Sequence, residues 1–139
     1  MRGTVLAFGT FDVLHLGHVK FFQAARRLGK RLVVVVARDK NVRRVKGRMP
    51  YFSERERLQL VSSLKAVDSA VLGSQKNRYA IIARLKPDVV VLGYDQAEDE
   101  SRLKEKLVEL RSPARIVRLK PFEPKRHKSW KVKNFVEKC

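Results

Sequence analysis

Two histidines three residues apart, His15 and His18, flank a glycine, Gly17, shortly after an apolar run near the start of the chain. Imidazole rings donate hydrogen bonds to phosphate oxygens, and residues three apart on a helix lie on the same face. Donors placed in this way stabilise charge on a pentacovalent phosphorus more than they stabilise the ground state. The spacing therefore predicts a polyphosphate site. The competing interpretation is a pair of incidental surface histidines at the start of a helix.

The residues around the histidines also predict a suitable backbone. Gly9 and Thr10 follow the apolar run and allow a sharp turn, where backbone N–H groups face an anion. Leu16 then begins a predicted helix, whose N-terminus favours negative charge, and Gly17 leaves room for close approach of a ligand. Because positioning and electrostatics suffice for phosphoryl-type transfer, this chemistry needs no nucleophile or base from the protein.

Alternating strands and helices are expected to carry this site. Ser53, with Glu56 three residues later, forms a capping-box pattern, and Gly29 is a predicted helix C-cap. A basic segment at 38–50 is predicted to be a loop because it shows no apolar period. The predicted strands are 4–10, 31–37, 66–73, 88–95 and 114–119, and the predicted helices are 16–28, 53–64, 77–85 and 101–111, with a short one near 132–136.

This order predicts an α/β domain with a mainly parallel sheet, formed by residues 1–139 as a single domain with a basic tail from about residue 120. The β-branched run at 31–37 is typical of strands covered on both faces. Ligands of such sheets bind beyond the carboxyl ends of the strands, at a topological switch point. Polar segments follow three of the predicted strands, at 9–12, 38–41 and 93–96, which places the expected site at that edge.

The charge of the chain restricts its partners. Lys and Arg number 32 against 14 Asp and Glu, a formal net charge of +18, which attracts nucleotides or nucleic acid. No apolar run approaches the about 20 residues of a membrane helix, and no signal peptide is evident, so we expect a cytoplasmic protein without a membrane partner. The single cysteine, Cys139, excludes an intrachain disulfide and a cysteine-based metal cluster.

The stretch GTFDVLHLGH, residues 9–18, resembles the signature of the nucleotidyltransferase superfamily that carries an H-x-G-H motif. The resemblance continues through 51–61, 67–68 and 91–96, and so covers most of the chain up to about Gln96. Within this cytidylyltransferase-like superfamily, the chain is most similar to the archaeal-type FAD synthetases, which themselves resemble glycerol-3-phosphate cytidylyltransferase. The resemblance implies a Rossmann-like three-layer sandwich that joins a nucleoside monophosphate to a phosphomonoester and releases pyrophosphate.

The resemblance also implies roles for individual residues. His15, His18 and Lys46 would act on the triphosphate as catalytic residues, and Asp12 would sit by the acceptor phosphate or orient the motif. Arg57 matches an arginine of the following helix; the competing interpretation pairs it with glutamates of its own helix. The residues expected to bind the nucleotide are Gly9, Thr10, Phe11, Asp12, His15, Leu16, Gly17, His18, Arg57, Gly93, Tyr94, Asp95 and Ser129.

The C-terminal part departs from the superfamily pattern. Where relatives carry a segment of the form S-T-T-x-I that grips the outer phosphates, this chain has KSWKV at 128–132. Ser129 is retained, but Trp130 replaces a hydroxyl residue. One interpretation is that Lys128 or Lys131 supplies the lost phosphate contact by charge. The alternatives are a reduced activity or a different acceptor.

The resemblance implies ATP and FMN as partners, with FAD and pyrophosphate as products. Three scattered histidines form no zinc site, so no metal site on the protein is expected, and a divalent cation such as Mg²⁺ would be held mainly by substrate phosphates. An alternative within the class is a cytidylyltransferase that uses CTP and glycerol 3-phosphate or another small polyol phosphate. An alternative of another class is a basic nucleic-acid-binding protein, and a homodimer is allowed for because homologous folds often dimerise.

Overall fold

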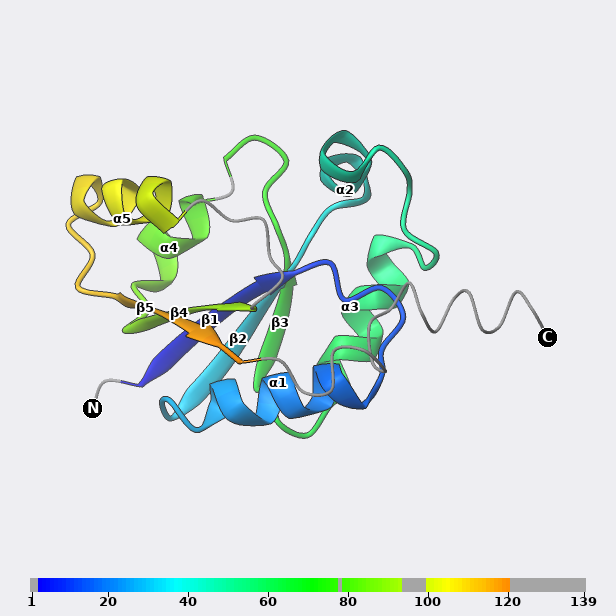
Figure 1. Ribbon diagram of the computed structural model, residues 1–139, viewed down its shortest axis with the longest axis horizontal. Coiled ribbons are helices and arrows are strands. Elements are labelled where there is room, and N and C mark those ends of the chain that lie inside the picture. Colours follow the sequence, from blue (N-terminus) through cyan, green and yellow to red (C-terminus); the bar gives the residue numbers. More distant parts are fainter. Residues whose placement is uncertain (1–2, 78, 94–99, 121–139) are drawn as a thin grey trace.

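The computed structural model describes residues 3–77, 79–93 and 100–120 of the chain. Strands and helices alternate along most of it, as Figure 1 shows. The strands are β1 (Thr4–Gly9), β2 (Arg31–Val36), β3 (Ser69–Leu72), β4 (Val89–Gly93) and β5 (Arg115–Leu119). The helices are α1 (Leu16–Arg26), α2 (Asp39–Lys46), α3 (Glu54–Ser62), α4 (Ala80–Leu85) and α5 (Glu100–Glu109).

The strands form one sheet in the order β3-β2-β1-β4-β5, in which each neighbouring pair is parallel. The chain runs outward from β1 through β2 to β3, then returns to the other side of β1 for β4 and β5. The topological switch point therefore lies between β1 and β4, and ligands of such sheets bind at the carboxyl ends of strands there. The predicted α/β class with a mainly parallel sheet is confirmed.

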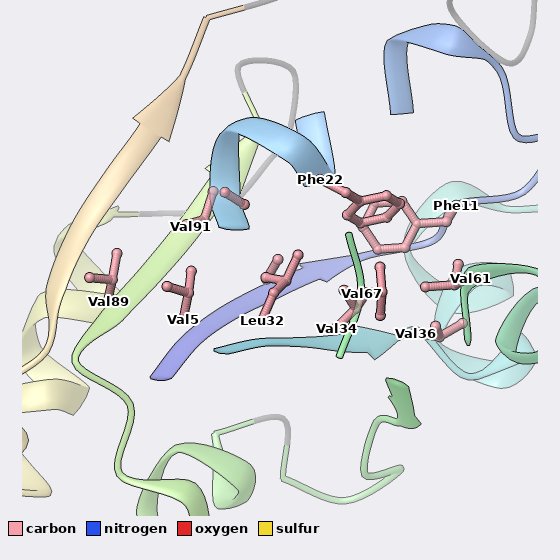
Figure 2. Close-up of a cluster of buried hydrophobic side chains, with 12 residues drawn as sticks. Val5, Phe11, Phe22, Leu32, Val34, Val36, Val61, Val67, Val89 and Val91 are labelled. Atoms are coloured by element: carbon pink, nitrogen blue, oxygen red, sulfur yellow. The ribbon is translucent and has the colours of Figure 1, made fainter. Parts of the chain in front are cut away.

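Helices cover both faces of the sheet, which makes the fold a three-layer sandwich (Figure 1). Alternate residues of β1 enter two separate cores: Val5 and Ala7 face α1 and α3, whereas Leu6 and Phe8 face α4 and α5. Figure 2 shows the first of these cores, in which Phe22 of α1 lies over the valines of the central strands. Since both faces are buried, the central strands are continuous apolar runs instead of alternating ones.

At the amino ends of the strands, a carboxylate aligns β1 with β4, the two strands of the switch point. Asp88, directly before β4, accepts hydrogen bonds from the backbone N–H groups of Gly3 (2.8 Å) and Thr4 (3.1 Å). Further along the two strands, the parallel pairing of β1 with β4 places Ala7 beside Val91. Gly9 and Gly93 each lie two residues further along their strands, so the two strands end at the same level.

One part of the predicted organisation was wrong: the segment 38–50 is not a loop throughout but contains α2. Val42 is the only buried side chain of this helix, so the sequence lacks the apolar period by which a helix is recognised. The terminal signals are nevertheless present. Asp39 stands in the first turn, and Gly47 ends the helix with φ +77°, a conformation that suits glycine.

Smaller differences concern the ends of elements. Gly29 does not cap α1, because the C-cap is Arg27 in a right-handed conformation. A Cβ at position 29 would lie 2.5 Å from the Gly3 carbonyl oxygen, so glycine is needed there for close approach of the segment before β1. The third strand and the fourth helix are shorter than predicted, whereas the capping box of Ser53 and Glu56 on α3 is present as expected. The short helix predicted near 132–136 lies outside the described residues.

Candidate active site

The turn after β1 is held by an aromatic residue in an unusual conformation. Phe11 has φ +51°, which few non-glycine residues adopt, and its buried ring packs 4.8 Å from that of Phe22. A Cβ at Gly9 would lie 2.4 Å from the Cζ atom of Phe11. The sequence predicted that Gly9 makes the turn, but the left-handed residue is Phe11. Gly9 makes room for the Phe11 ring.

Asp12 fixes this turn to the segment that leads into α3. Its two carboxylate oxygens accept hydrogen bonds from the backbone N–H groups of Tyr51 (2.7 Å) and Phe52 (2.9 Å), and the residue is only 7% exposed. Of the two roles that the resemblance implies for Asp12, this geometry matches the one of orienting the motif.

The two histidine side chains cap backbone N–H groups at the start of α1. His15 is the N-cap, and its Nδ1 accepts a hydrogen bond from the N–H of Gly17 (3.1 Å). The Nδ1 of His18 accepts one from the N–H of His15 (3.2 Å). Because Nδ1 is the acceptor in both rings, the neutral tautomer of each carries its proton on Nε2. The ring centroids lie 4.0 Å apart, so the two imidazole rings stand side by side at the helix N-terminus.

The charge state of His18 follows from its surroundings. Burial, and then the neighbouring charge of His15, lower the pKa of His18 from 6.5 to about 3. His18 is therefore neutral at physiological pH and donates through Nε2 alone. The positive end of α1 adds a favourable field for an anion at the same place.

Arg57 is fully buried beneath the site. Its side chain is 0% exposed and donates to the carbonyl oxygens of Thr10 (Nη1, 2.8 Å) and Phe52 (Nε, 3.1 Å). Its Nη2 forms an ion pair with Asp39 at 2.6 Å. This corrects one expectation: the carboxylate partner of Arg57 comes from α2 instead of its own helix. The guanidinium supports the turn after β1, and a role for Arg57 in binding the nucleotide stays a prediction.

Further charged contacts extend this support across the ends of β2 and β3. Asp39 and Glu54 cap each other: the N–H of Asp39 donates to Glu54 (2.9 Å), and the N–H of Glu54 donates to Asp39 (3.2 Å). Arg38 bridges Glu54 (2.8 Å) and the carbonyl oxygen of Gly73 (2.8 Å). The hydrogen bond from Asp39, together with Arg38, lowers the pKa of the Glu54 carboxyl. These contacts hold α2 and α3 at the carboxyl edge of the sheet.

Lys46 lies at the exposed C-terminal end of α2. This helix follows β2, whose neighbour β1 leads to the histidines, so Lys46 and the histidines belong to the same edge of the sheet. Arg43 and Arg44 stand in the same last turn, and the helix thus carries several cations.

Gly93 ends β4 at the switch point and is held by a residue that sequence reasoning missed. Arg118 on β5 donates from Nη1 to the Gly93 carbonyl oxygen (2.6 Å) and from Nε to Glu100 (2.7 Å). Nothing in the sequence distinguishes Arg118 from other arginines on strands at the edge of a sheet. Its partners Gly93 and Glu100 lie 25 and 18 residues earlier in the chain. Tyr94, Asp95 and Ser129, which were also expected to bind the nucleotide, lie outside the described residues.

No group of three or more His, Cys, Asp or Glu side chains among the described residues is arranged to hold a metal ion. The Asp12 carboxylate, the nearest acidic group to the histidines in sequence, already accepts two backbone N–H groups. Across the same part of the chain, no helix has the length and apolarity to cross a membrane.

A parallel sheet with two histidine donors at a helix N-terminus beside the switch point defines an α/β protein of the nucleotidyltransferase type. The chain belongs to the cytidylyltransferase-like family, which matches residues 6–134. It is 49% identical over 127 residues to the FAD synthase of Methanothrix thermoacetophila, which covers 89% of this chain and 87% of that protein. It is 44% identical over 119 residues to the FAD synthase of Thermoplasma acidophilum, with 86% and 83% covered.

Solved structures agree with this assignment. The lipopolysaccharide core biosynthesis protein from Thermoplasma volcanium superposes with a TM-score of 0.83 at 42% identity, covering 88% of this chain and all of that one. Pantothenate synthetase from Thermus thermophilus, at 19% identity and a TM-score of 0.53, shares the fold over 86% of this chain and 56% of that one. The family and the fold predicted from the sequence are confirmed.

Proposed function

We propose that this protein is an FMN adenylyltransferase, which transfers AMP from ATP to FMN and yields FAD and pyrophosphate. The observation that carries the proposal is that the Nδ1 atoms of His15 and His18 both accept backbone N–H groups at the N-terminus of α1, which leaves Nε2 as the N–H donor of each neutral ring. The choice of substrates is supported by relatives named FAD synthase, 42–49% identical over more than four fifths of this chain.

In this reaction a phosphate oxygen of FMN attacks the α-phosphorus of ATP. The new P–O–P linkage forms as the bond from the α-phosphorus to its bridging oxygen breaks, and pyrophosphate leaves. The attacking phosphate is already an anion, so no side chain has to remove a proton. His15 and His18 donate to the oxygens whose charge grows on the pentacovalent phosphorus, and the field of α1 acts in the same direction.

A divalent cation would enter with the triphosphate as part of the substrate. The described acidic residues of the site are engaged with backbone N–H groups and arginines, which fits a cation bound through phosphate oxygens. Lys46, at the end of α2, would add positive charge for the outer phosphates, which a point charge on a long side chain serves well.

The second candidate is a cytidylyltransferase acting on glycerol 3-phosphate or another small phosphomonoester. The match to the cytidylyltransferase-like family favours it, since the histidine pair would serve either nucleotide. The residues predicted to line the nucleoside pocket after Gly93 are Tyr94 and Asp95, and they lie outside the described residues.

Pyrophosphate release tests the proposal directly. ATP and CTP are crossed with FMN, glycerol 3-phosphate and phosphopantetheine, each with Mg²⁺, Mn²⁺ or Co²⁺. We expect release with ATP and FMN, together with FAD formation by chromatography. The double variant His15→Ala/His18→Ala serves as the inactive control, and Lys65→Ala, an exposed residue after α3, serves as the active one. Release only with CTP and a polyol phosphate would replace the proposal with the second candidate.

A further inference from the structure

Exposed apolar side chains gather on the segments around the histidines. Six large apolar side chains are exposed among the described residues, and four of them belong to the start of α1 or to the stretch from α2 to the residue before Phe52. Small-molecule sites combine apolar walls with a few placed polar groups, so this distribution indicates a ligand surface. The four residues are Leu16 (48%), Val45 (71%), Met49 (52%) and Tyr51 (72%).

Tyr51 combines an exposed ring with a fixed backbone. Its N–H donates to Asp12 at 2.7 Å, and the next N–H, of Phe52, donates to the same carboxylate. Asp12 lies three residues before His15, and three extended residues span at most about 11 Å. In Figure 1 the turn after β1 and the segment between α2 and α3 lie at the same end of the molecule. Tyr51 is thus held within reach of a ligand whose phosphate lies at the histidines.

The ring itself is open to stacking. Phe52 meets it at a centroid distance of 4.9 Å and an interplanar angle of 90°, so the two rings touch edge to face. That arrangement leaves at least one face of the Tyr51 ring uncovered by Phe52. A rigid aromatic side chain fixed at its backbone loses little conformational freedom when it binds a flat ligand.

We propose that Tyr51 stacks against the isoalloxazine ring of FMN and thereby selects a flavin phosphate over a polyol phosphate as acceptor. The inference rests on the proposed function and adds the residue that decides its acceptor. In FMN the ribityl chain separates the ring from the reacting phosphate, so the ring must bind away from the histidines. Leu16 and Met49 are also exposed, on the start of α1 and on the segment that leads to Tyr51, and apolar side chains of this kind favour a fused ring system that loses water on binding. Glycerol 3-phosphate has no ring and gains nothing from this surface.

The stacking contact is made equally before and during the reaction. Its loss therefore raises KM for FMN while kcat changes little. We expect Tyr51→Ala to weaken FMN binding about 10- to 100-fold, and Tyr51→Phe to keep affinity within about threefold, because the aromatic face is retained. KM for ATP stays unchanged in both variants.

The experiment measures FMN binding by quenching of flavin fluorescence, without ATP, and in parallel the steady-state kinetics of pyrophosphate release. Leu60→Ala, an exposed apolar residue on α3 (40%), is the matched control and should bind FMN as the unsubstituted protein does. Thermal unfolding of each variant reports whether the fold is intact.

The results separate this inference from the proposed function. If Tyr51→Ala binds and quenches FMN as well as the unsubstituted protein, which still makes FAD, the stacking role is wrong and the function stands. If kcat and both KM values change together with a loss of thermal stability, Tyr51 is structural and the inference fails. If the unsubstituted protein neither binds FMN nor releases pyrophosphate with it, the proposed FMN adenylyltransferase activity is wrong. The proposed role of Tyr51 in binding FMN is then wrong as well.

Discussion

The hydrogen bonds of His15 and His18 decide which ring nitrogen of each carries the proton. Each Nδ1 accepts a backbone N–H at the start of α1, so the proton of each neutral ring is on Nε2. Protonation of either Nδ1 would remove a cap from α1. For His18 the arrangement thus favours the neutral ring, in agreement with its lowered pKa.

The first prediction concerns the rate of transfer. We expect His15→Ala and His18→Ala each to lower kcat about 100- to 1000-fold, because each removes a donor aimed at transition-state charge. KM for ATP should change much less. Steady-state kinetics of pyrophosphate release check this, and equal losses in nucleotide affinity and in rate would contradict it. His18→Gln retains an N–H group near the Nε2 position and should lose less activity than His18→Ala.

A second prediction concerns stability and pH. The pKa of His18 is about 3 in the folded state and 6.5 as its ordinary value, so between these pH values the unfolded chain binds the extra proton. The free energy of unfolding therefore falls as pH is lowered from 6.5 towards 3, by up to about 1.4 kcal/mol per pH unit. Urea unfolding at several pH values measures this slope, which should be shallower in His18→Gln. Identical slopes in the two proteins would refute the assignment.

A third prediction tests the packing of Phe11 over Gly9. A methyl group at position 9 would overlap the Phe11 ring. That ring is itself packed against Phe22, which opposes its displacement. Gly9→Ala should therefore lower the free energy of unfolding by about 1–3 kcal/mol and reduce activity. Gly73→Ala is the control, since its nearest neighbour would lie at an ordinary 3.4 Å. Equal stability of the two variants in urea would argue against this packing role.

At the scale of elements, a charged network joins α2 and α3 to the turn after β1. Arg57 reaches Thr10, Phe52 and Asp39, which belong to three segments far apart in sequence. The helix that carries Lys46 is secured at its start by Asp39 and, in the core, by Val42. Its position relative to the histidines therefore depends on the ion pair between Asp39 and Arg57.

The fourth prediction removes this support. Breaking a buried ion pair leaves an uncompensated charge, so Arg57→Met should lower the free energy of unfolding by about 3–5 kcal/mol. Asp39→Asn should cost less, because Asp39 is partly exposed, and the double variant should lose less than the sum of both. Arg55→Met, an exposed arginine two residues away on α3, is the control. Additive losses in urea unfolding would show that the two residues act independently.

The order of elements was predictable from sequence, but α2 and the burial of Arg57 were not. Strands buried on both faces are long β-branched runs, and that pattern depends only on neighbouring residues. A helix with a single buried residue has no such pattern. Arg57 was interpreted as a ligand contact because a motif names the residue type. Its burial depends on Asp39, 18 residues earlier, and on Thr10, 47 residues earlier.

At the scale of the whole molecule, the net charge of +18 remains the least specific feature. A strongly positive surface raises the local concentration of ATP and also attracts nucleic acid without regard to sequence. A cytoplasmic location, a homodimer and the single domain over residues 1–139 stay predictions.

The fifth prediction separates the two uses of this charge. If the charge serves substrate capture, KM for ATP rises as NaCl increases from about 0.05 M to about 0.5 M, whereas kcat changes little, since screening acts on encounter. Steady-state kinetics across this series measure the effect. Binding of a labelled duplex that falls steeply with salt and is unaltered by His15→Ala, in a protein that releases no pyrophosphate, would favour the nucleic-acid alternative.

The sequence by itself determined the α/β class and the family, and it predicted the edge of the sheet and the histidine pair as the site. These properties follow from local patterns: buried runs, a turn between strand and helix, and residues one helical turn apart. Only the tertiary structure decided that Asp12 holds a backbone segment, that Arg57 is buried, that Phe11 makes the turn, and that Tyr51 stands exposed beside the site. Each of these depends on contacts between distant segments, and such contacts exist only after the chain has folded.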